Sequence, residues 1–209
     1  MRLSEAEGVT TTSKVQRILQ LAEERRVLRP RDLTAIGISP RYLSILRDQG
    51  VLEQPARGLY MLTNADVSEH VDMAQAAKLV PQGVVCLLSS LAFHGLTTQL
   101  PHQVWMAIDP GARLPRGDRP PLRIVRFSEP ALSAGVEEHD VDGVPVRVFD
   151  PAKTVADCFK YRNKIGLDVA IEGLKDCWRQ HACTMEELWR YAEICRVSRI
   201  MKPYLESLD

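Results

Sequence analysis

Apolar residues recur at helical spacing near the start of the chain. Val15, Ile18 and Ala22 are separated by three or four residues, which predicts a helix that begins at Ser13. The preceding residues are polar, rich in threonine and without periodicity. We therefore predict that residues 1–12 form a disordered lead-in.

Proline, glycine and serine indicate two shorter helices in the next part of the chain. Pro30 suits the first turn of a helix that Gly37 ends, because proline lacks an N–H and glycine readily takes a left-handed conformation. Ser39 is suited to cap a third helix, with Pro40 at its first position and its end near Gln49. The sequence therefore predicts three helices in succession.

The third helix has one apolar face, because helical periodicity turns Leu43 and Leu46 toward the other two helices. The residues that then point outward are Arg41, Ser44, Ile45 and Asp48, and those on the flanks are Tyr42 and Arg47. The segment VLEQPARGLYMLT that follows predicts a two-stranded hairpin with Arg57 at its tip. This order of elements predicts a winged helix-turn-helix at residues 13–63.

Strand and helix patterns are mixed in residues 64–209, which predicts a larger domain and an α+β fold class. A helix within residues 64–82, capped by Asp66 or Ser68, precedes the buried strand VVCLL and a short helix SSLAFHG that serine opens. Further strands are predicted at QVWMAI, LRIVRF and on both sides of the two-residue turn at Asp142-Gly143. From Asp150, which is suited to cap a helix, the pattern is that of a helical bundle-like segment.

Composition places the chain among globular proteins. Its 209 residues are 45% apolar and 26% charged. The sequence lacks an apolar run of membrane-spanning length and an apolar signal sequence, so we expect a cytoplasmic protein that does not enter a membrane. The five cysteines form no C-x-x-C pair and are expected to be buried, reduced thiols.

Charge is distributed unevenly although the net charge is zero. Residues 1–63 contain ten Lys or Arg and seven Asp or Glu, a net charge of +3 that the rest of the chain balances. This sign favours contact between the first domain and the phosphates of double-stranded DNA.

The residue types on the third helix suit base recognition in the major groove. Arg41 is suited to guanine, Ser44 to either kind of base and Ile45 to a thymine methyl group. Arg31 at a helix start and Arg57 at the hairpin tip are placed to contact phosphates. The alternative is an adaptor whose winged helix docks a partner protein.

The second domain contains a possible basic surface and little catalytic chemistry. The basic residues are Arg123, Arg126, Arg147, Lys153, Lys160, Arg162 and Lys164. The alternative is a solvated face balanced by acids such as Asp157. Asp140 and Asp142 resemble the metal-binding pair of a nucleotidyl transferase, but the hairpin turn already accounts for Asp142. His94 is expected to be a core or boundary histidine, and no metal or cofactor motif is present, so we do not expect an enzyme.

Three runs of residues resemble the AbiE-type (AbiEi) abortive-infection antitoxins of bacterial toxin-antitoxin systems. They are RGLYML, VVCLLSSLAFHGLT and the stretch that includes DPAKTVADCFKYR at residues 150–162. The resemblance implies a repressor that binds repeats upstream of its own operon through Arg41, Ser44 and Arg47 in the recognition helix and Arg57 in the wing. It also implies that the second domain counters a nucleotidyltransferase-like toxin, with or without a direct complex, and that catalytic residues and cofactors are absent.

Overall fold

The computed structural model describes residues 3–63, 70–114 and 120–208, and it confirms the α+β class. Within these ranges, no helix combines the length and the apolar character that crossing a bilayer requires. The chain forms two compact units. Unit 1 comprises Met1–Lys78, Gly117–Pro120 and Asp140–Pro145, and unit 2 comprises Leu79–Arg116, Pro121–His139 and Val146–Asp209.

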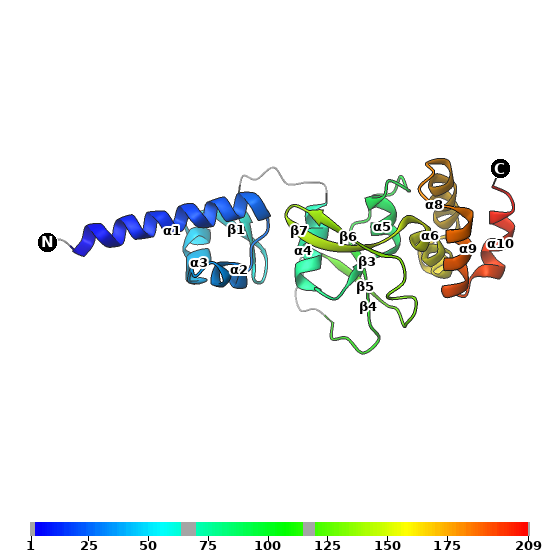
Figure 1. The fold of residues 1–209 in the computed structure, drawn as a ribbon, viewed down its shortest axis with the longest axis horizontal. Coiled ribbons are helices and arrows are strands. Elements are labelled where there is room, and N and C mark those ends of the chain that lie inside the picture. Colours follow the sequence, from blue (N-terminus) through cyan, green and yellow to red (C-terminus); the bar gives the residue numbers. More distant parts are fainter. Residues whose placement is uncertain (1–2, 64–69, 115–119, 209) are drawn as a thin grey trace. The chain divides into compact units, whose positions relative to one another are not determined.

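Unit 1 contains three helices followed by a hairpin, in the predicted order (Figure 1). The elements are α1 (Leu3–Arg25), α2 (Pro30–Ala35), α3 (Arg41–Asp48), β1 (Leu52–Ala56) and β2 (Leu59–Leu62), and α4 (Val71–Leu79) comes next. An apolar core that includes Ile18, Leu33, Leu43, Leu46 and Leu52 joins the three helices to the hairpin. The buried faces of the three helices thus share one core, which stabilises α2 and α3, helices of six and eight residues that are too short to persist alone.

Two helix starts in unit 1 differ from the sequence-based expectation. α1 begins at Leu3, so a helix occupies residues 3–12, where we predicted a disordered lead-in. No proline interrupts this stretch. Once packing further along the chain anchors a helix, each added residue that is ordered gains one hydrogen bond, so the helix can extend. α3 begins at Arg41, one residue later than predicted, although the hydroxyl of Ser39 still accepts the N–H of Arg41 at 3.4 Å. The predicted caps at Asp66 and Ser68 lie outside the described residues.

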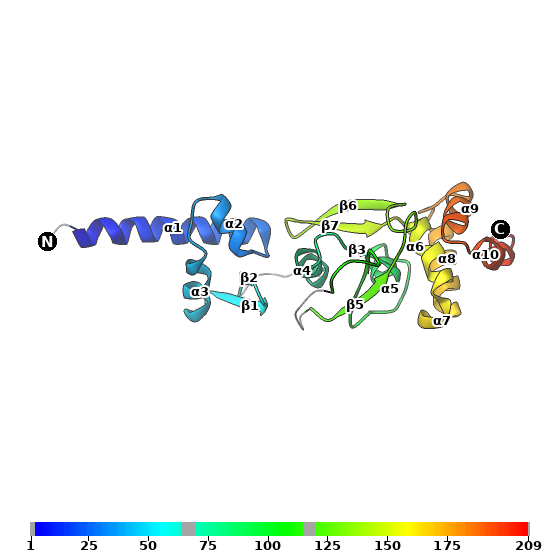
Figure 2. The ribbon, with the colours of Figure 1, turned by 90° about the horizontal axis from the view of Figure 1, so that it is seen from below.

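Unit 2 is built on a five-stranded mixed sheet with strand order β5-β4-β3-β7-β6. Figure 2 shows β6 and β7 side by side at one edge of it. Its strands are β3 (Val84–Val85), β4 (Val104–Ile108), β5 (Leu122–Arg126), β6 (Val136–Val141) and β7 (Val144–Phe149). β3 pairs antiparallel with β4 and parallel with β7, and β4 pairs parallel with β5. Asp142 and Gly143 have φ of 54° and 70°, which confirms the predicted turn between β6 and β7.

The predicted strand VVCLL is shorter than expected, and the next helix does not begin at serine. β3 ends at Val85, and α5 (Leu87–Phe93) begins at Leu87, whose φ of 50° turns the chain sharply. The serines lie inside this helix and bond to the sheet: Ser89 Oγ accepts the N–H of Trp105 at 2.9 Å. A tertiary hydrogen bond has therefore replaced the predicted cap.

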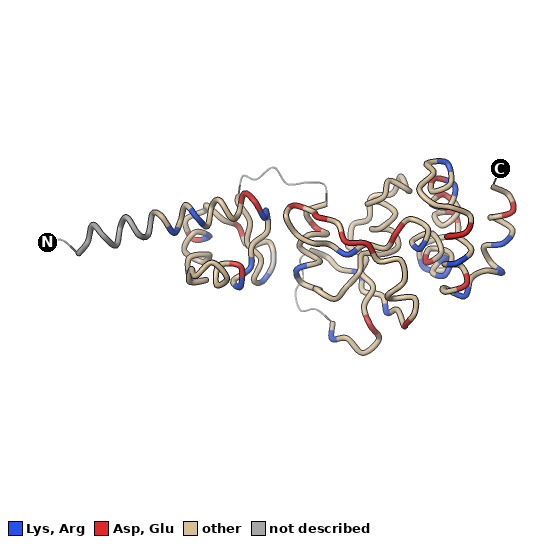
Figure 3. Tube along the Cα trace, in the orientation of Figure 1, with Lys and Arg blue, Asp and Glu red and all other residues tan. Residues whose placement is uncertain are grey.

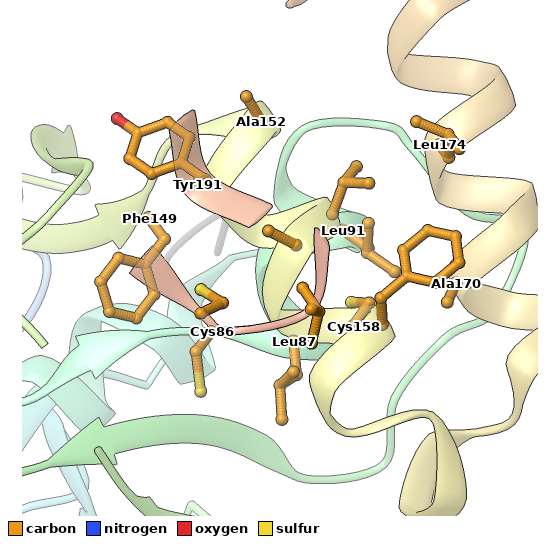
Figure 4. Packing of buried hydrophobic residues seen from close by; sticks show 14 of the residues in the cluster. Cys86, Leu87, Leu91, Phe149, Ala152, Cys158, Ala170, Leu174 and Tyr191 are labelled. Carbon is orange, nitrogen blue, oxygen red and sulfur yellow. The ribbon is translucent and has the colours of Figure 1, made fainter. Parts of the chain in front are cut away.

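Helices complete unit 2 and cover its core. They are α6 (Pro151–Lys160), α7 (Arg162–Ile165), α8 (Leu167–Arg179), α9 (Met185–Ile194) and α10 (Ser198–Leu205), and they gather at the carboxyl-terminal end of the unit (Figures 1 and 2). Asp150 caps α6 as predicted, since its carboxylate accepts the N–H of Lys153 at 2.7 Å. Figure 4 shows Cys86 and Cys158 among the apolar side chains of this core. All five cysteines are buried free thiols, as predicted.

Candidate nucleic-acid interface

α3 presents a polar outer surface because its leucines are used in the core. Leu43 and Leu46 are 1% and 2% exposed, which confirms the predicted inward face. Arg41 lies on the opposite side and is exposed, and Ile45 is 39% exposed. Among the described residues, the Arg41 guanidinium has no hydrogen bond or ion pair, so its five donors remain available to a ligand.

The two flanking candidates on α3 differ in what they already contact. Tyr42 is half-buried and packs against the core of unit 1, which leaves only part of its ring accessible. The Arg47 guanidinium donates to Asp48 Oδ1 at 2.7 and 3.0 Å and to Gln54 Oε1 at 2.9 Å. Arg47 therefore ties α3 to β1 of the hairpin, and a phosphate would have to compete with the carboxylate of Asp48 for it.

The hairpin carries an exposed arginine beside its turn. Arg57 is exposed and precedes Gly58, whose φ of 75° suits the tight connection between β1 and β2. The register shifts between Glu53 and Ala56, where Pro55 has no N–H to pair. The bulge and the glycine therefore shape the loop that presents Arg57.

A second group of arginines surrounds the start of α2. Asp32 accepts the N–H of Arg29 at 2.6 Å and forms an ion pair with Arg25 at 3.3 Å. Lys78 also donates to Asp32, at 3.5 Å, and to the carbonyl oxygen of Val27. Burial, and to a smaller degree the charge of Arg31, lower the pKa of Arg29, whereas the charge of Asp32 opposes this shift.

From the sequence we selected Arg31 of this group as a phosphate contact, but not Arg29. Arg31 is exposed and Arg29 is half-buried, so both reach the surface on which phosphate contact was predicted. The signal was present in the sequence, because RRVLRPR places four arginines within residues 25–31. Arg25 is less available than these two, since it is paired with Asp32.

The predicted basic surface of the second domain is smaller than expected because Lys153 is 0% exposed. Its ammonium lies 3.9 Å from the ring centroid of Phe149 and 5.1 Å from that of Phe127, and it pairs with Asp157. Asp157 is also 0% exposed, so it cannot balance surface charge as the alternative interpretation required. The spacing of four residues on α6 makes the pair possible, and two aromatic faces cover it.

The remaining basic residues of unit 2 are divided among different contacts. Arg126 Nη1 donates to the carbonyl oxygens of the loop after β4, and Arg147 and Arg162 each donate to one backbone carbonyl. Arg123 lies over the ring of Trp105, and the exposed Lys160 and Lys164 lie over the rings of Phe127 and Tyr161. In Figure 3, basic residues occur along α6 and α7, whereas acidic residues follow one another along β6. The exposed basic residues of this set are therefore Arg123, Arg126, Lys160 and Lys164.

Two of the runs that carry the family resemblance, VVCLLSSLAFHGLT and DPAKTVADCFKYR, meet in one polar junction. Ser90 of α5, His94 directly after α5 and Thr154 of α6 converge on the carbonyl oxygen of Phe149, at 3.0, 2.8 and 3.2 Å. Ser90 Oγ and Thr154 Oγ1 are also 2.7 Å apart. Burial lowers the pKa of His94, which favours its neutral form. The contacts of His94 are those of the predicted boundary histidine.

Asp140 and Asp142, whose spacing resembles that of a metal-binding pair, both belong to the hairpin that β6 and β7 form. Asp140 Oδ1 accepts the N–H of Gly143 at 3.0 Å, and Asp142 occupies the left-handed position of the same turn. Within the described ranges, no cluster of three His, Cys, Asp or Glu side chains is arranged to hold a metal ion.

Comparison with known proteins gave a family match over part of the chain and similar solved structures. A family model described as "Transcriptional regulator, AbiEi antitoxin" matches residues 16–63. The crystal structure of the RV2827C protein from Mycobacterium tuberculosis superposes with a TM-score of 0.62 at 18% identity, covering 92% of this chain and 77% of that chain. At this identity the likeness shows a shared fold. A search of curated proteins found no match.

Proposed function

Because residues 16–63 match the AbiEi family of transcriptional regulators and antitoxins, we propose that the chain is a DNA-binding autorepressor and the antitoxin of an abortive-infection system. Residues 13–63 act in this proposal as a winged helix-turn-helix, and residues 64–209 act against a nucleotidyltransferase-like toxin. The proposal needs neither a catalytic residue nor a cofactor. The observation that carries it is the inward packing of Leu43 and Leu46, which leaves the outer face of α3 free to contact a duplex.

In the proposed complex, α3 occupies the major groove of double-stranded DNA at operator repeats. The groove admits a helix, and the guanidinium of Arg41 at the first turn of α3 supplies a fork of donors for guanine O6 and N7. Ser44 and Ile45 follow one turn further along. Arg31 at the start of α2 and Arg57 on the hairpin contact phosphates, which hold the protein in register without reading sequence.

Arg41 and Arg57 should have separable effects on binding. Replacing Arg41 with glutamine should weaken cognate binding by about 1–3 kcal/mol and relax base preference at one position, because a bidentate base contact is lost. Replacing Arg57 with glutamine should weaken cognate and scrambled duplexes alike. Fluorescence anisotropy with both duplexes measures the difference, and Arg199→Gln, an exposed change on α10, serves as the control. Equal losses on both duplexes for both variants would contradict the assigned roles.

Cognate affinity should fall steeply with salt. Contact with about five phosphates releases the cations condensed on them, which gives a slope of roughly −4 to −5 in a plot of log K against log salt concentration. Anisotropy titrations at several salt concentrations measure this slope. A flat response would reject phosphate binding by Arg31 and Arg57, whereas Arg57→Gln should reduce the magnitude of the slope by about 1.

A protein-docking adaptor is the second candidate, and the 39% exposed Ile45 on the outer face of α3 favours it. An adaptor would retain its partner in a pull-down after nuclease treatment. A DNA-binding repressor would lose nucleic-acid-bridged partners under the same treatment and would still shift a duplex that contains its operator.

A further inference from the structure

Unit 2 contains a cavity of about 590 Å³ that the proposed function does not use. Its walls come from the chain after α4, the end of β4 and the loop that follows it, the segment after β5, and β7. This volume is within the range of sites that hold small molecules.

The cavity has an apolar part. Val80 and Ile108 line it and are 8% and 2% exposed, so they form fixed parts of the wall. Leu132, which is half-buried, extends this apolar lining. A ligand with a short apolar body would remove water from these side chains, which is favourable in proportion to the area covered.

Two arginines line the same cavity without an acidic partner. Arg147 is half-buried, and the hydrogen bond of its guanidinium is to the carbonyl oxygen of Gln82 at 3.3 Å. Arg113 is exposed and makes no hydrogen bond with any described residue. In the described part of the chain, neither arginine forms an ion pair. A half-buried cation without a counter-ion favours the binding of an anion.

The acids of the cavity already accept hydrogen bonds from neighbouring groups. Asp109 Oδ1 accepts the N–H of Gly111 at 2.7 Å, and Glu129 accepts the hydroxyl of Ser133. The charged groups with most unused hydrogen-bonding capacity in the cavity are therefore the guanidinium donors of Arg147 and Arg113.

The wall that carries Arg113 is held in place by another arginine. Arg126 Nη1 donates to the carbonyl oxygens of Asp109 at 2.9 Å and Ala112 at 3.1 Å, and it also donates to Pro110 at 2.5 Å. One guanidinium nitrogen thus contacts three carbonyl oxygens of this loop. The arrangement positions Arg113 at the edge of the cavity before any ligand arrives.

We propose that this cavity binds a small organic anion, a carboxylate on a short apolar body. Arg147 and Arg113 receive the carboxylate, because a planar guanidinium fork matches its two oxygens. Val80, Ile108 and Leu132 cover the apolar body. This site goes beyond the proposed function, and its test is independent of DNA and toxin.

Isothermal titration of the full chain with three carboxylates tests the proposal: phenylacetate, 3-phenylpropionate and 4-methylpentanoate. At least one should bind saturably with a Kd of about 1 mM or tighter, as expected for ligands of this size. Its neutral amide should bind at least about tenfold more weakly, because the amide cannot pair with the arginines. Absence of saturation with all three, or equal binding of acid and amide, would overturn the proposal.

Variants locate the bound anion. Arg147→Gln and Arg113→Gln should each weaken carboxylate binding, by about tenfold for Arg147→Gln because that guanidinium is the more buried. Arg123→Gln is the matched control, since Arg123 is exposed on β5, lies over Trp105 and does not line the cavity. Thermal melts confirm that each variant is folded. Wild-type affinity in both Arg147→Gln and Arg113→Gln, or a loss in Arg123→Gln alone, would show that the anion binds elsewhere.

Discussion

Replacing Lys153 with methionine should lower the free energy of unfolding of unit 2 by about 3–5 kcal/mol. The change removes one partner of a pair whose side chains are both 0% exposed, and leaves the carboxylate of Asp157 buried without its cation. A Cys195 thiol 3.1 Å from Asp157 Oδ1 cannot replace that charge. Urea unfolding followed by tryptophan fluorescence measures the loss, because Trp105, Trp178 and Trp189 all belong to unit 2.

Two further variants distinguish the effect of the unpaired carboxylate of Asp157 from the effect of losing the packing of the Lys153 side chain. Lys153→Met combined with Asp157→Leu should recover most of the stability, because no unpaired charge then remains in the core. Lys160→Met lies on the same helix at an exposed position and should change stability by less than about 0.5 kcal/mol. A double variant as unstable as Lys153→Met alone would show that packing, and not the unpaired carboxylate, causes the loss.

The deficit of Lys153→Met should also depend on pH. Burial already raises the pKa of Asp157 above its ordinary value of 3.8, and the charge of Lys153 opposes this shift. Without Lys153, the pKa of Asp157 in the folded protein should rise further above its pKa in the unfolded chain. A raised carboxyl pKa reduces stability as pH increases from the unfolded to the folded value, so the deficit should shrink in acid.

Replacing Leu43 with alanine should lower the stability of unit 1 by about 2–5 kcal/mol, because it leaves a cavity in the core that joins α1, α2, α3 and the hairpin. Far-UV circular dichroism should show an earlier loss of helix on heating. The tryptophan transition should stay unchanged, since it reports on unit 2. DNA binding should be lost at temperatures at which unit 1 is unfolded.

Ile45→Ala is the matched control on the same helix. Ile45 is 39% exposed, so its truncation should cost less than about 1 kcal/mol and leave the melt of unit 1 nearly unchanged. Any effect of this variant on DNA binding would then reflect the surface of α3. Equal destabilisation by Leu43→Ala and Ile45→Ala would contradict the inward and outward faces of the helix.

Features set by neighbouring residues were predicted well from the sequence. The inward leucines of α3, the Asp150 cap and the turn at Asp142-Gly143 follow from helical periodicity, capping and the need for positive φ. Each depends on contacts within a few residues. These local signals therefore predicted both the candidate recognition helix, α3, and several element boundaries of the second domain.

Features set by distant residues were predicted poorly. Lys153 is typical of a surface lysine in sequence, but it is buried against Phe149 at the end of β7 and against Phe127, which follows β5 and is distant in sequence. Ser89 was expected to open a helix, but the N–H of Trp105 from another strand uses its hydroxyl. The contact of Arg47 with Gln54 likewise joins two elements. Periodicity carries no information about these partners.

β3 has only two residues, and this affects how the two halves of the sheet in unit 2 are held together. Two residues are all that connect β4 on one side with β7 on the other, so few ladder bonds cross the middle of the sheet. Ser89 and Ser90 on α5 reinforce this join, one bonding to β4 and the other to Phe149 at the end of β7. α5 thus connects the two halves of the sheet, and a change that removes both serine hydroxyls would leave the two residues of β3 as the ladder between β4 and β7.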